Sequence, residues 1–352
     1  MMNGRHVAFW LVIMLVLVAL LWLLHDILLP FVAGAALAYV LDPLADRIER
    51  LGVNRTVAAL LIVAAAVVVL AGLILLLVPL LVQQGSALLA RIPGYIQRVK
   101  ELIVDRNLPW LDWLGTGDSK QTASDLVNKA AAWLLTFAYS LWTGGKALVS
   151  FASLLIVMPV VTFYLIVDWR PMIKIIDGWV PVRQRETVRR LAGDIDAAIG
   201  AFLRGQIGIC LVLGVYYAVG LMLVGLDFAL LIGLVAGLIT FVPFIGSMTG
   251  LMIATSVAIA QFWPDWKRIL AVVAVFLVGQ FLEGNVLAPK LVGERVGLHP
   301  VWMMFAMFAF GYLFGFVGLL LAVPLAAAIA VLSRFALRQY LESSFYTGEK
   351  SP

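Results

Sequence analysis

The chain is poor in charge and has almost no cysteine or histidine. Asp, Glu, Lys and Arg make up 13% of its 352 residues, whereas soluble domains average about 25%. The single cysteine, Cys210, excludes an internal disulfide and a cysteine-based metal site. Because the three histidines are scattered along the chain, we expect the protein to hold no metal ion and to need no cofactor.

Catalytic and nucleotide-binding motifs are missing as well. Residues 144–147, Gly-Gly-Lys-Ala, lack both the spacing and the hydroxyl residue of a phosphate-binding loop, which excludes ATP hydrolysis of that kind. No His-Glu-x-x-His motif and no nucleophile–base pair is visible, so we do not expect an enzyme. The net charge of +5 is small and the basic residues cluster in loops, which argues against nucleic acid as a partner.

Hydrophobic residues dominate what is present. They make up 63% of the chain, and the mean hydropathy is +1.05. Since a spanning helix needs about 20 apolar residues, the apolar runs predict an all-α, polytopic transmembrane helical bundle with about eight crossings. The first run, residues 7–24, lacks a small-residue cleavage site and continues into a second run. We therefore interpret it as a retained helix and not as a signal peptide.

Changes in composition divide the chain into six segments. We expect N-terminal transmembrane helices at 1–82, an extramembrane helical insert at 83–148, a transmembrane helix at 149–168, a cytoplasmic basic loop and amphipathic helix at 169–203, a C-terminal transmembrane core at 204–335 and a cytoplasmic tail at 336–352. Proline and glycine mark several expected ends, at Pro43 after the second run and at Pro93-Gly94 in the insert. The amphipathic helix should lie along the membrane surface or dock under the bundle.

The distribution of Lys and Arg predicts the orientation. Loops at 42–55 and 169–206 and the Lys267-Arg268 corner are basic, and basic loops stay on the cytoplasmic side. Both termini are then cytoplasmic, and the insert, with Trp110 and Trp113 near an interface, lies outside.

Two apolar runs, at 228–262 and 301–332, are too long for a single ordinary crossing. Pro243 and Gly246 interrupt the first, which we interpret as a broken or re-entrant hairpin, with a kinked single helix as the alternative. The second contains Gly311, Gly315, Gly318 and Pro324, and we expect both runs to behave alike.

Polar residues follow the apolar run 269–282. An intramembrane carboxylate is costly, so Glu283, together with Asn285 and Pro289, is a candidate for a solute or ion pathway, either as a proton carrier or as a hydrogen-bond partner. The alternative is that the helix ends here and leaves Glu283 at the lipid headgroups. Our hypothesis is that residues 243–246 and 283–285 face one another across a solvent-accessible cavity.

Small residues at helical spacing provide a third pattern. Because small residues let two helix backbones approach closely, we expect these positions to lie in contacts between helices. The alternative is that they form a surface along which helices slide during a transport cycle. The residues are Gly233, Gly237, Gly311, Gly315 and Gly318. Arg204 and His299 stand at the ends of apolar runs and are interpreted as interfacial residues. Arg204 could instead bind an anionic lipid or pair with Asp194 or Asp196, and His299 could sense pH.

Five motifs in the second half occur together. They are Phe-Leu-Arg-Gly-Gln at 202–206, Phe-Val-Pro-Phe-Ile-Gly at 241–246, Glu-Gly-Asn at 283–285 leading to Pro-Lys-Leu-Val-Gly at 289–293, Val-Gly-Leu-His-Pro at 296–300, and the run from Gly311 to Pro324. In this order and spacing the chain resembles the AI-2E family of autoinducer-2 exporters. Gly284 and Phe244 depart from the family pattern, where a second acid or an asparagine and a tyrosine are common.

The resemblance implies a permease of the bacterial inner membrane that contacts membrane lipids and a small-molecule solute. Export of the quorum-sensing signal autoinducer-2 is described for some members of the family, and sodium or lithium/proton antiport for others. It also implies a homo-oligomer, with a pentamer known in the family. A function from another class, an oligomeric membrane scaffold or regulatory protein that docks partners through residues 83–148, stays open at this point.

Overall fold

The computed structural model describes residues 27–105, 145–243, 245–292 and 299–343, together with residues 16, 20, 23, 24 and 346. These residues form helices and short connections, and no strand occurs among them, which confirms the all-α prediction. The predictions for Trp110, Trp113 and most of the insert at 83–148 lie outside the described residues. The same holds for most of the first apolar run and for the end of the tail.

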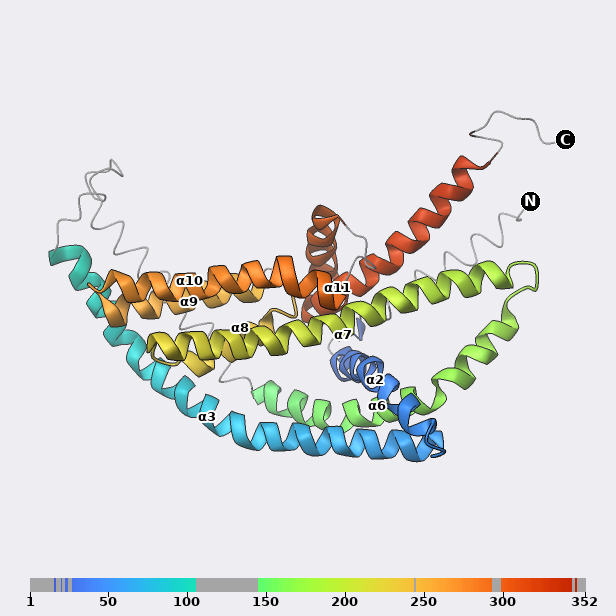
Figure 1. Ribbon diagram of the computed structural model, residues 1–352, viewed down its shortest axis with the longest axis horizontal. Coiled ribbons are helices and arrows are strands. Elements are labelled where there is room, and N and C mark those ends of the chain that lie inside the picture. Colours follow the sequence, from blue (N-terminus) through green and yellow to red (C-terminus); the bar gives the residue numbers. More distant parts are fainter. Residues whose placement is uncertain are drawn as a thin grey trace. The chain divides into compact units, whose positions relative to one another are not determined.

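Nine helical elements follow one another in the described chain (Figure 1). They are α2 (Leu28–Glu49), α3 (Arg55–Asp105), α6 (Gly145–Trp179), α7 (Arg185–Val224), α8 (Ala229–Ile239), α9 (Ile245–Phe262), α10 (Trp266–Leu282), the π-helix η2 (Glu283–Val292) and α11 (Pro300–Leu341). Seven stretches within them are long and apolar enough to cross a membrane, and α8 is a shorter apolar helix.

Several expected helix ends are wrong, because helices continue through prolines. α2 runs through Pro43, and α3 runs through Pro79 and Pro93 without a break. A proline inside a helix leaves the carbonyl four residues earlier without its donor. At Pro43 that carbonyl belongs to Tyr39, and the Arg204 guanidinium donates to it at 3.4 Å. A side chain from a distant part of the sequence thus satisfies the group that the proline frees.

The basic loop predicted after residue 168 is also mostly helical. α6 continues to Trp179 and α7 begins at Arg185, so only a short connection separates them. α7 then runs without interruption into the fifth predicted span, so the boundary expected at 203/204 lies inside one helix.

The chain forms two compact units, each discontinuous in sequence. The first contains the residues up to 67, 150–206 and those from 289 onward, and the second contains 68–149 and 207–288. The division cuts through α3, α6, α7 and η2, so it could not be read from composition.

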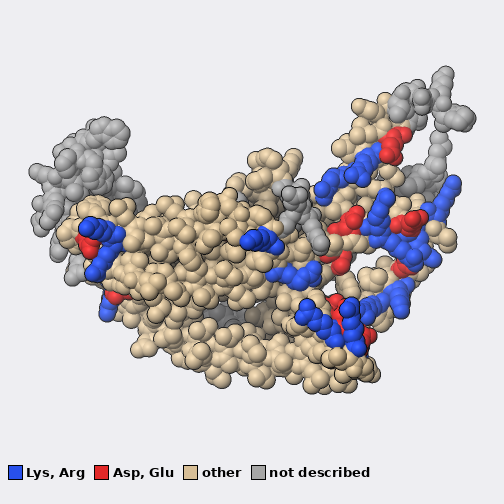
Figure 2. Space-filling view, in the orientation of Figure 1, with Lys and Arg blue, Asp and Glu red and all other residues tan. Residues whose placement is uncertain are grey.

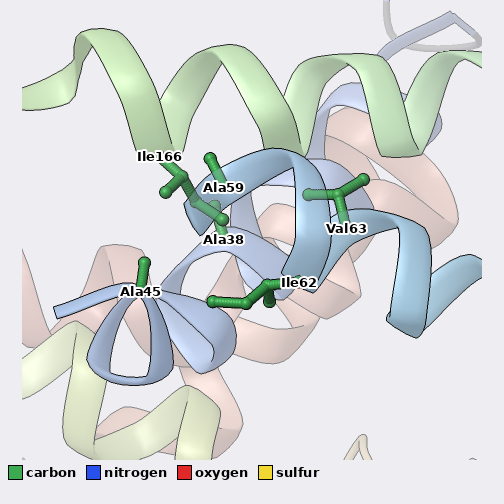
Figure 3. Close-up of a cluster of buried hydrophobic side chains, with 6 residues drawn as sticks. All are labelled: Ala38, Ala45, Ala59, Ile62, Val63 and Ile166. Atoms are coloured by element: carbon green, nitrogen blue, oxygen red, sulfur yellow. The ribbon is translucent and has the colours of Figure 1, made fainter. Parts of the chain in front are cut away.

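In the first unit, α2, α3 and α6 pack around small side chains (Figure 3). Ala45 and Ala59 are fully buried there, and Ile166 of α6 closes the cluster. Gly34 of α2 lies so close to α6 that an added Cβ would stand 2.9 Å from the Met158 carbonyl oxygen. The buried Thr162 hydroxyl lies 3.0 Å from the Gly34 carbonyl oxygen. Small residues therefore set the distance between these helices.

A charge cluster joins the same three helices at one end. Arg55 of α3 contacts Asp42, Asp46 and Glu49 of α2, and its Nε donates to the Ile166 carbonyl at 3.0 Å. Arg170 of α6 adds a second cation, 2.6 Å from Asp46 and 3.3 Å from Glu49. Every acid in this cluster has a basic partner.

α11 reverses direction at Gly315. That residue has φ +59° and ψ −139°, a conformation that side chains other than glycine disfavour. An added Cβ on Gly318 would stand 1.9 Å from the Phe310 carbonyl oxygen, and one on Gly311 would stand 2.9 Å from Leu319. The two limbs of α11 therefore fold against each other, and the run at 301–332 is broken, as the run at 228–262 is.

In the second unit, glycines bring α7, α8 and α10 into close contact. An added Cβ on Gly237 would stand 2.2 Å from the Gly214 Cα, and one on Gly233 would stand 2.2 Å from the Ala218 nitrogen. α9 packs against both α8 and α10 (Figure 1). Such backbone-to-backbone contacts leave the helices little freedom to shift without a steric clash.

A polar network closes one end of the second unit. Asp227, between α7 and α8, accepts from Arg91 at 2.6 Å and from Tyr95 at 3.0 Å, and its backbone amide donates to Gln261 at 2.8 Å. Arg91 belongs to the insert predicted outside, whereas Gln261 shortly precedes the Lys267-Arg268 corner predicted inside. Residues that share one contact lie on one side of a membrane, so these two predictions cannot both hold.

Asp265 lies 3.3 Å from Arg268, and its side chain caps the N-terminus of α10. If the insert lies outside, as predicted, the Lys267-Arg268 corner lies outside with it.

Candidate functional site

α8 ends at Ile239 and α9 begins at Ile245, and the described residues of the interruption between them are 240–243. Pro243 supplies no amide donor and restricts Val242, which ends the helical path. Gly246 follows in the first turn of α9, where an added Cβ would stand 2.2 Å from the Thr240 nitrogen. Glycine is therefore required for the start of α9 to pack against the end of α8.

Local hydrogen bonds satisfy the described amides of this break. The Phe241 amide donates to Leu238 at 3.1 Å, the Val242 amide to Ile239 at 3.0 Å and the Ile245 amide to Val242 at 3.3 Å. These three amides are therefore already paired and are not available to a solute. Side chains are the better candidates for solute contact.

A side-chain hydrogen bond connects the break to the end of α10. The buried Ser247 hydroxyl, next to Gly246, donates to the Gln280 side-chain carbonyl at 2.5 Å. Gln280 precedes Glu283 by three residues, a spacing that places both side chains on neighbouring parts of one helix face. The break and the Glu283 region, far apart in sequence, are thus adjacent in the second unit.

Glu283 stands where α10 passes into the π-helix η2. The helix does not end at Leu282, and Glu283 is buried with 9% of its surface exposed. Its Oε2 has no hydrogen-bond partner within the described part of the chain. π-helical turns are rare and occur often at functional sites. A buried carboxylate oxygen without a partner is costly, which makes it a candidate for contact with an ion, water or solute.

Tyr217 of α7 provides a second polar group beside Glu283. Its ring stacks on Phe276 with centroids 4.6 Å apart, and its hydroxyl lies 2.6 Å from the position that a Cβ on Gly279 would take. The side chain is fully buried, and its hydroxyl has no partner among the residues described. Gly279 precedes Glu283 by four residues, so the Tyr217 hydroxyl lies about one helical turn from Glu283. Two polar groups without a partner among the described residues therefore lie near each other on α10 and η2.

The other predicted pathway residues are placed differently. The Asn285 side chain is exposed, and its amide donates to the Phe281 carbonyl of the same helix at 3.1 Å. Pro289 is also exposed, further along η2. Pro243 is half-buried in the break. Of the five predicted residues, Gly246 and Glu283 are buried, and Gly246 serves packing.

Arg204 and His299 have structural contacts. Arg204 donates to the Tyr39 carbonyl, while Asp196 accepts from the Tyr39 hydroxyl at 2.8 Å. The salt bridges of the described residues do not include one from Arg204 to Asp194 or Asp196. His299 precedes α11 and its Nδ1 accepts from the Val301 amide at 3.3 Å, which makes it a helix cap.

Three polar residues of this region were not predicted from the sequence: Tyr217, Ser247 and Gln280. A signal was present, because each is a polar residue inside a long apolar run. Periodicity alone could not rank them, since exposed polar residues such as Thr249 and Ser256 occur in the same runs and bond to their own helix.

Comparison with known proteins agrees with this architecture. A model of the AI-2E family transporter matches residues 11–338. The chain belongs to the AI-2E transporter family. It is therefore a multi-pass membrane protein of a transporter family, as the motifs indicated.

Relatives in several bacteria have transport names. The chain is 27% identical over 326 residues to "Putative transport protein YrrI" of Bacillus subtilis, covering 91% of this chain and 90% of the relative. It is 27% identical over 325 residues to "Putative permease PerM" of Escherichia coli, with 91% and 90% covered. It is 23% identical over 305 residues to "Putative transport protein YueF" of Bacillus subtilis, with 85% and 81% covered.

Proposed function

We propose that this protein is a secondary or facilitative permease that exports a small polar solute, and that Glu283 contacts the solute in its pathway. The family and the transport names of its relatives support a permease. The observation that supports the site is the buried Glu283 carboxylate in a candidate membrane span, one oxygen of which has no partner among the residues that the structure describes.

The groups around Glu283 define the chemical class of the solute. The Tyr217 hydroxyl can donate a hydrogen bond and Glu283 Oε2 can accept one, and neither has a partner among the described residues. Each buried group left unsatisfied costs about 1–3 kcal/mol. A small solute with hydroxyl groups would satisfy both at once. The hydroxylated furanone autoinducer-2, for which the family is named, is the first solute to test.

Cation antiport is the second candidate, and the same carboxylate favours it. Carboxylate oxygens bind hard cations, and a carboxylate that alternates between proton and cation would support Na⁺(Li⁺)/H⁺ exchange. A scaffold or regulatory role is the candidate from another class, and it predicts that flux is indifferent to Glu283 and Pro243.

Flux in proteoliposomes with imposed proton or sodium gradients tests these functions. Glu283→Gln keeps the shape and hydrogen bonding of the side chain but cannot titrate, whereas Glu283→Ala removes both properties. Proton coupling predicts that the Gln variant loses gradient-driven flux and retains downhill exchange. A role in solute contact alone predicts that Gln transports with an unchanged pH dependence and that Ala does not transport.

Glu342→Gln is the matched control, because Glu342 is an exposed carboxylate after α11. It should transport like the wild type. If Glu283→Ala also transports normally while folded, the Glu283 pathway is wrong, and a scaffold becomes the better interpretation.

The family resemblance further supports a homo-oligomer, with a pentamer as the specific expectation, in the inner membrane with both termini cytoplasmic. Mass measurement in mild detergent tests the assembly. Labelling with a membrane-impermeant thiol reagent on intact cells tests the topology. In a Cys210→Ser background, the reagent should label Lys267→Cys and should not label Gln184→Cys.

A further inference from the structure

The end of α6 and the start of α7 form a helical hairpin in the first unit, and one of its faces is apolar and largely exposed. The apolar residues of α6 recur at helical spacing and share one side of the helix. They are Trp169, Met172, Ile173, Ile176 and Trp179. Their exposed fractions run from 36% at Trp169 to 77% at Trp179, and Val182 in the connection is 81% exposed. Leaving this surface in water costs about 25 cal/mol per Å².

The same hairpin is strongly basic. Residues 169–190 contain six basic and two acidic residues, a net charge of +4. Figure 2 shows the blue Lys and Arg surfaces gathered over the region where Figure 1 draws the α6–α7 connection. An apolar face beside an excess of positive charge is typical of segments that lie in a membrane interface.

Part of this positive charge is already paired. Arg170 contacts Asp46 and Glu49, and Arg189 contacts Asp177 at 2.6 Å. Arg185 lies 3.9 Å from Asp177. The Asp177 contacts join α6 to α7 and preform the hairpin. Lys174, Arg183 and Arg190 have no acidic partner in the described part of the chain, so their charges are available.

Helix length places the C-terminal end of α6 and the connection to α7 beyond the hydrocarbon core. The candidate span in α6 covers 26 residues, from Leu154 to Trp179, whereas a crossing needs about 20. The surplus lies at the C-terminal end, where the tryptophans and basic residues are. Tryptophan is enriched at the level of the headgroups, and Lys and Arg there reach toward phosphate and water.

We propose that the hairpin at 169–190 docks on the leaflet next to the α6 span. Its apolar face enters the acyl boundary, and Lys174, Arg183 and Arg190 bind the phosphates of anionic phospholipids. Charge complementarity favours an anionic lipid surface as the partner of this hairpin. A symmetric contact between two copies of the hairpin would place two segments of charge +4 next to each other, and their repulsion opposes such a contact.

A spin label on Val182→Cys, in a Cys210→Ser background, tests the proposal in the full-length protein. The label's accessibility to oxygen and to a water-soluble nickel chelate is measured in vesicles of phosphatidylcholine alone and of phosphatidylcholine with phosphatidylglycerol. We expect membrane burial of the label with phosphatidylglycerol, and weaker burial at high salt.

In the variant Lys174→Gln/Arg183→Gln/Arg190→Gln, burial of the label should no longer depend on anionic lipid. The preference for vesicles with phosphatidylglycerol should fall about fivefold for each basic residue removed. Arg47→Gln/Arg50→Gln/Arg338→Gln removes the same charge from exposed positions elsewhere in the first unit and should keep that dependence. Three results would overturn the proposal. They are a label exposed to water in both vesicles, equal burial in both, and spin–spin coupling between copies, which would show that a second chain covers the face.

Discussion

In the first unit Arg55 lies among three carboxylates, whereas in the second unit Glu283 keeps a buried oxygen without a partner among the described residues. Both sites lie among apolar helices. Burying a charge is costly unless it is paired, and breaking a buried pair costs more than the pair contributes. This difference in pairing distinguishes charged residues that stabilise the fold from those that are available to a ligand. Substitutions in the first site should change stability, and those in the second should change transport.

The largest expected effect is on stability at Arg55. Arg55→Met removes the cation shared by Asp42, Asp46 and Glu49, and only 13% of the Arg55 side chain is exposed. Losing a buried partner costs about 3–5 kcal/mol, and the partly exposed carboxylates reduce this to about 2 kcal/mol here. Thermal unfolding in detergent measures the loss. Arg50→Met, at an exposed position of the same end, should unfold like the wild type.

Glu283→Gln should give the opposite pattern. An amide removes the cost of a buried charge with an unpaired oxygen, so the free energy of unfolding should stay equal or rise by about 1 kcal/mol. Gradient-driven flux should fall at least about tenfold, the effect of losing roughly 1.4 kcal/mol. Unfolding curves and flux are measured on the same preparation. Strong destabilisation without a change in flux would make Glu283 structural, like the acids around Arg55.

Two neighbouring tyrosines sharpen the comparison. The Tyr217 hydroxyl has no partner among the described residues, whereas the Tyr216 hydroxyl donates to the Val275 carbonyl at 3.1 Å. Tyr217→Phe should leave stability nearly unchanged and weaken solute affinity several-fold, by about 1 kcal/mol. Tyr216→Phe should lower stability by about 1 kcal/mol and leave affinity alone. A solute-concentration series and thermal unfolding separate the two outcomes, and the reverse pattern would remove Tyr217 from the site.

The smallest effect is expected at the exposed edge of the first site. The Arg170 side chain is 51% exposed, although it contacts Asp46 and Glu49 as Arg55 does. Arg170→Ala should therefore cost only about 0.2–1 kcal/mol, and less at high salt. A loss comparable to that of Arg55→Met would show that exposure does not rank these pairs. Thermal unfolding at low and high salt provides the measurement.

Much of the architecture follows from local patterns. Long apolar runs require helices in lipid, because a backbone without water must satisfy its own polar groups. Pro243 and Gly315 mark real interruptions, since a missing amide and a positive φ act within one or two turns. Pro43 and Pro93 mark none. The same residue type ends a helix in one place and not in another, and at Pro43 the Arg204 guanidinium supplies a donor to the carbonyl that the proline frees.

The sequence by itself determined the helical class, the membrane and the family, and it singled out Glu283 as a candidate, because composition and motif spacing carry each of these. The tertiary structure decided which polar residues meet. Ser247 donates a hydrogen bond to Gln280, the Tyr217 hydroxyl lies close to Gly279, and Asn285 donates a hydrogen bond within its own helix. Glycine contacts bring distant helices within a few ångströms and select these neighbours. No local pattern contains that information, since packing joins residues that the sequence separates.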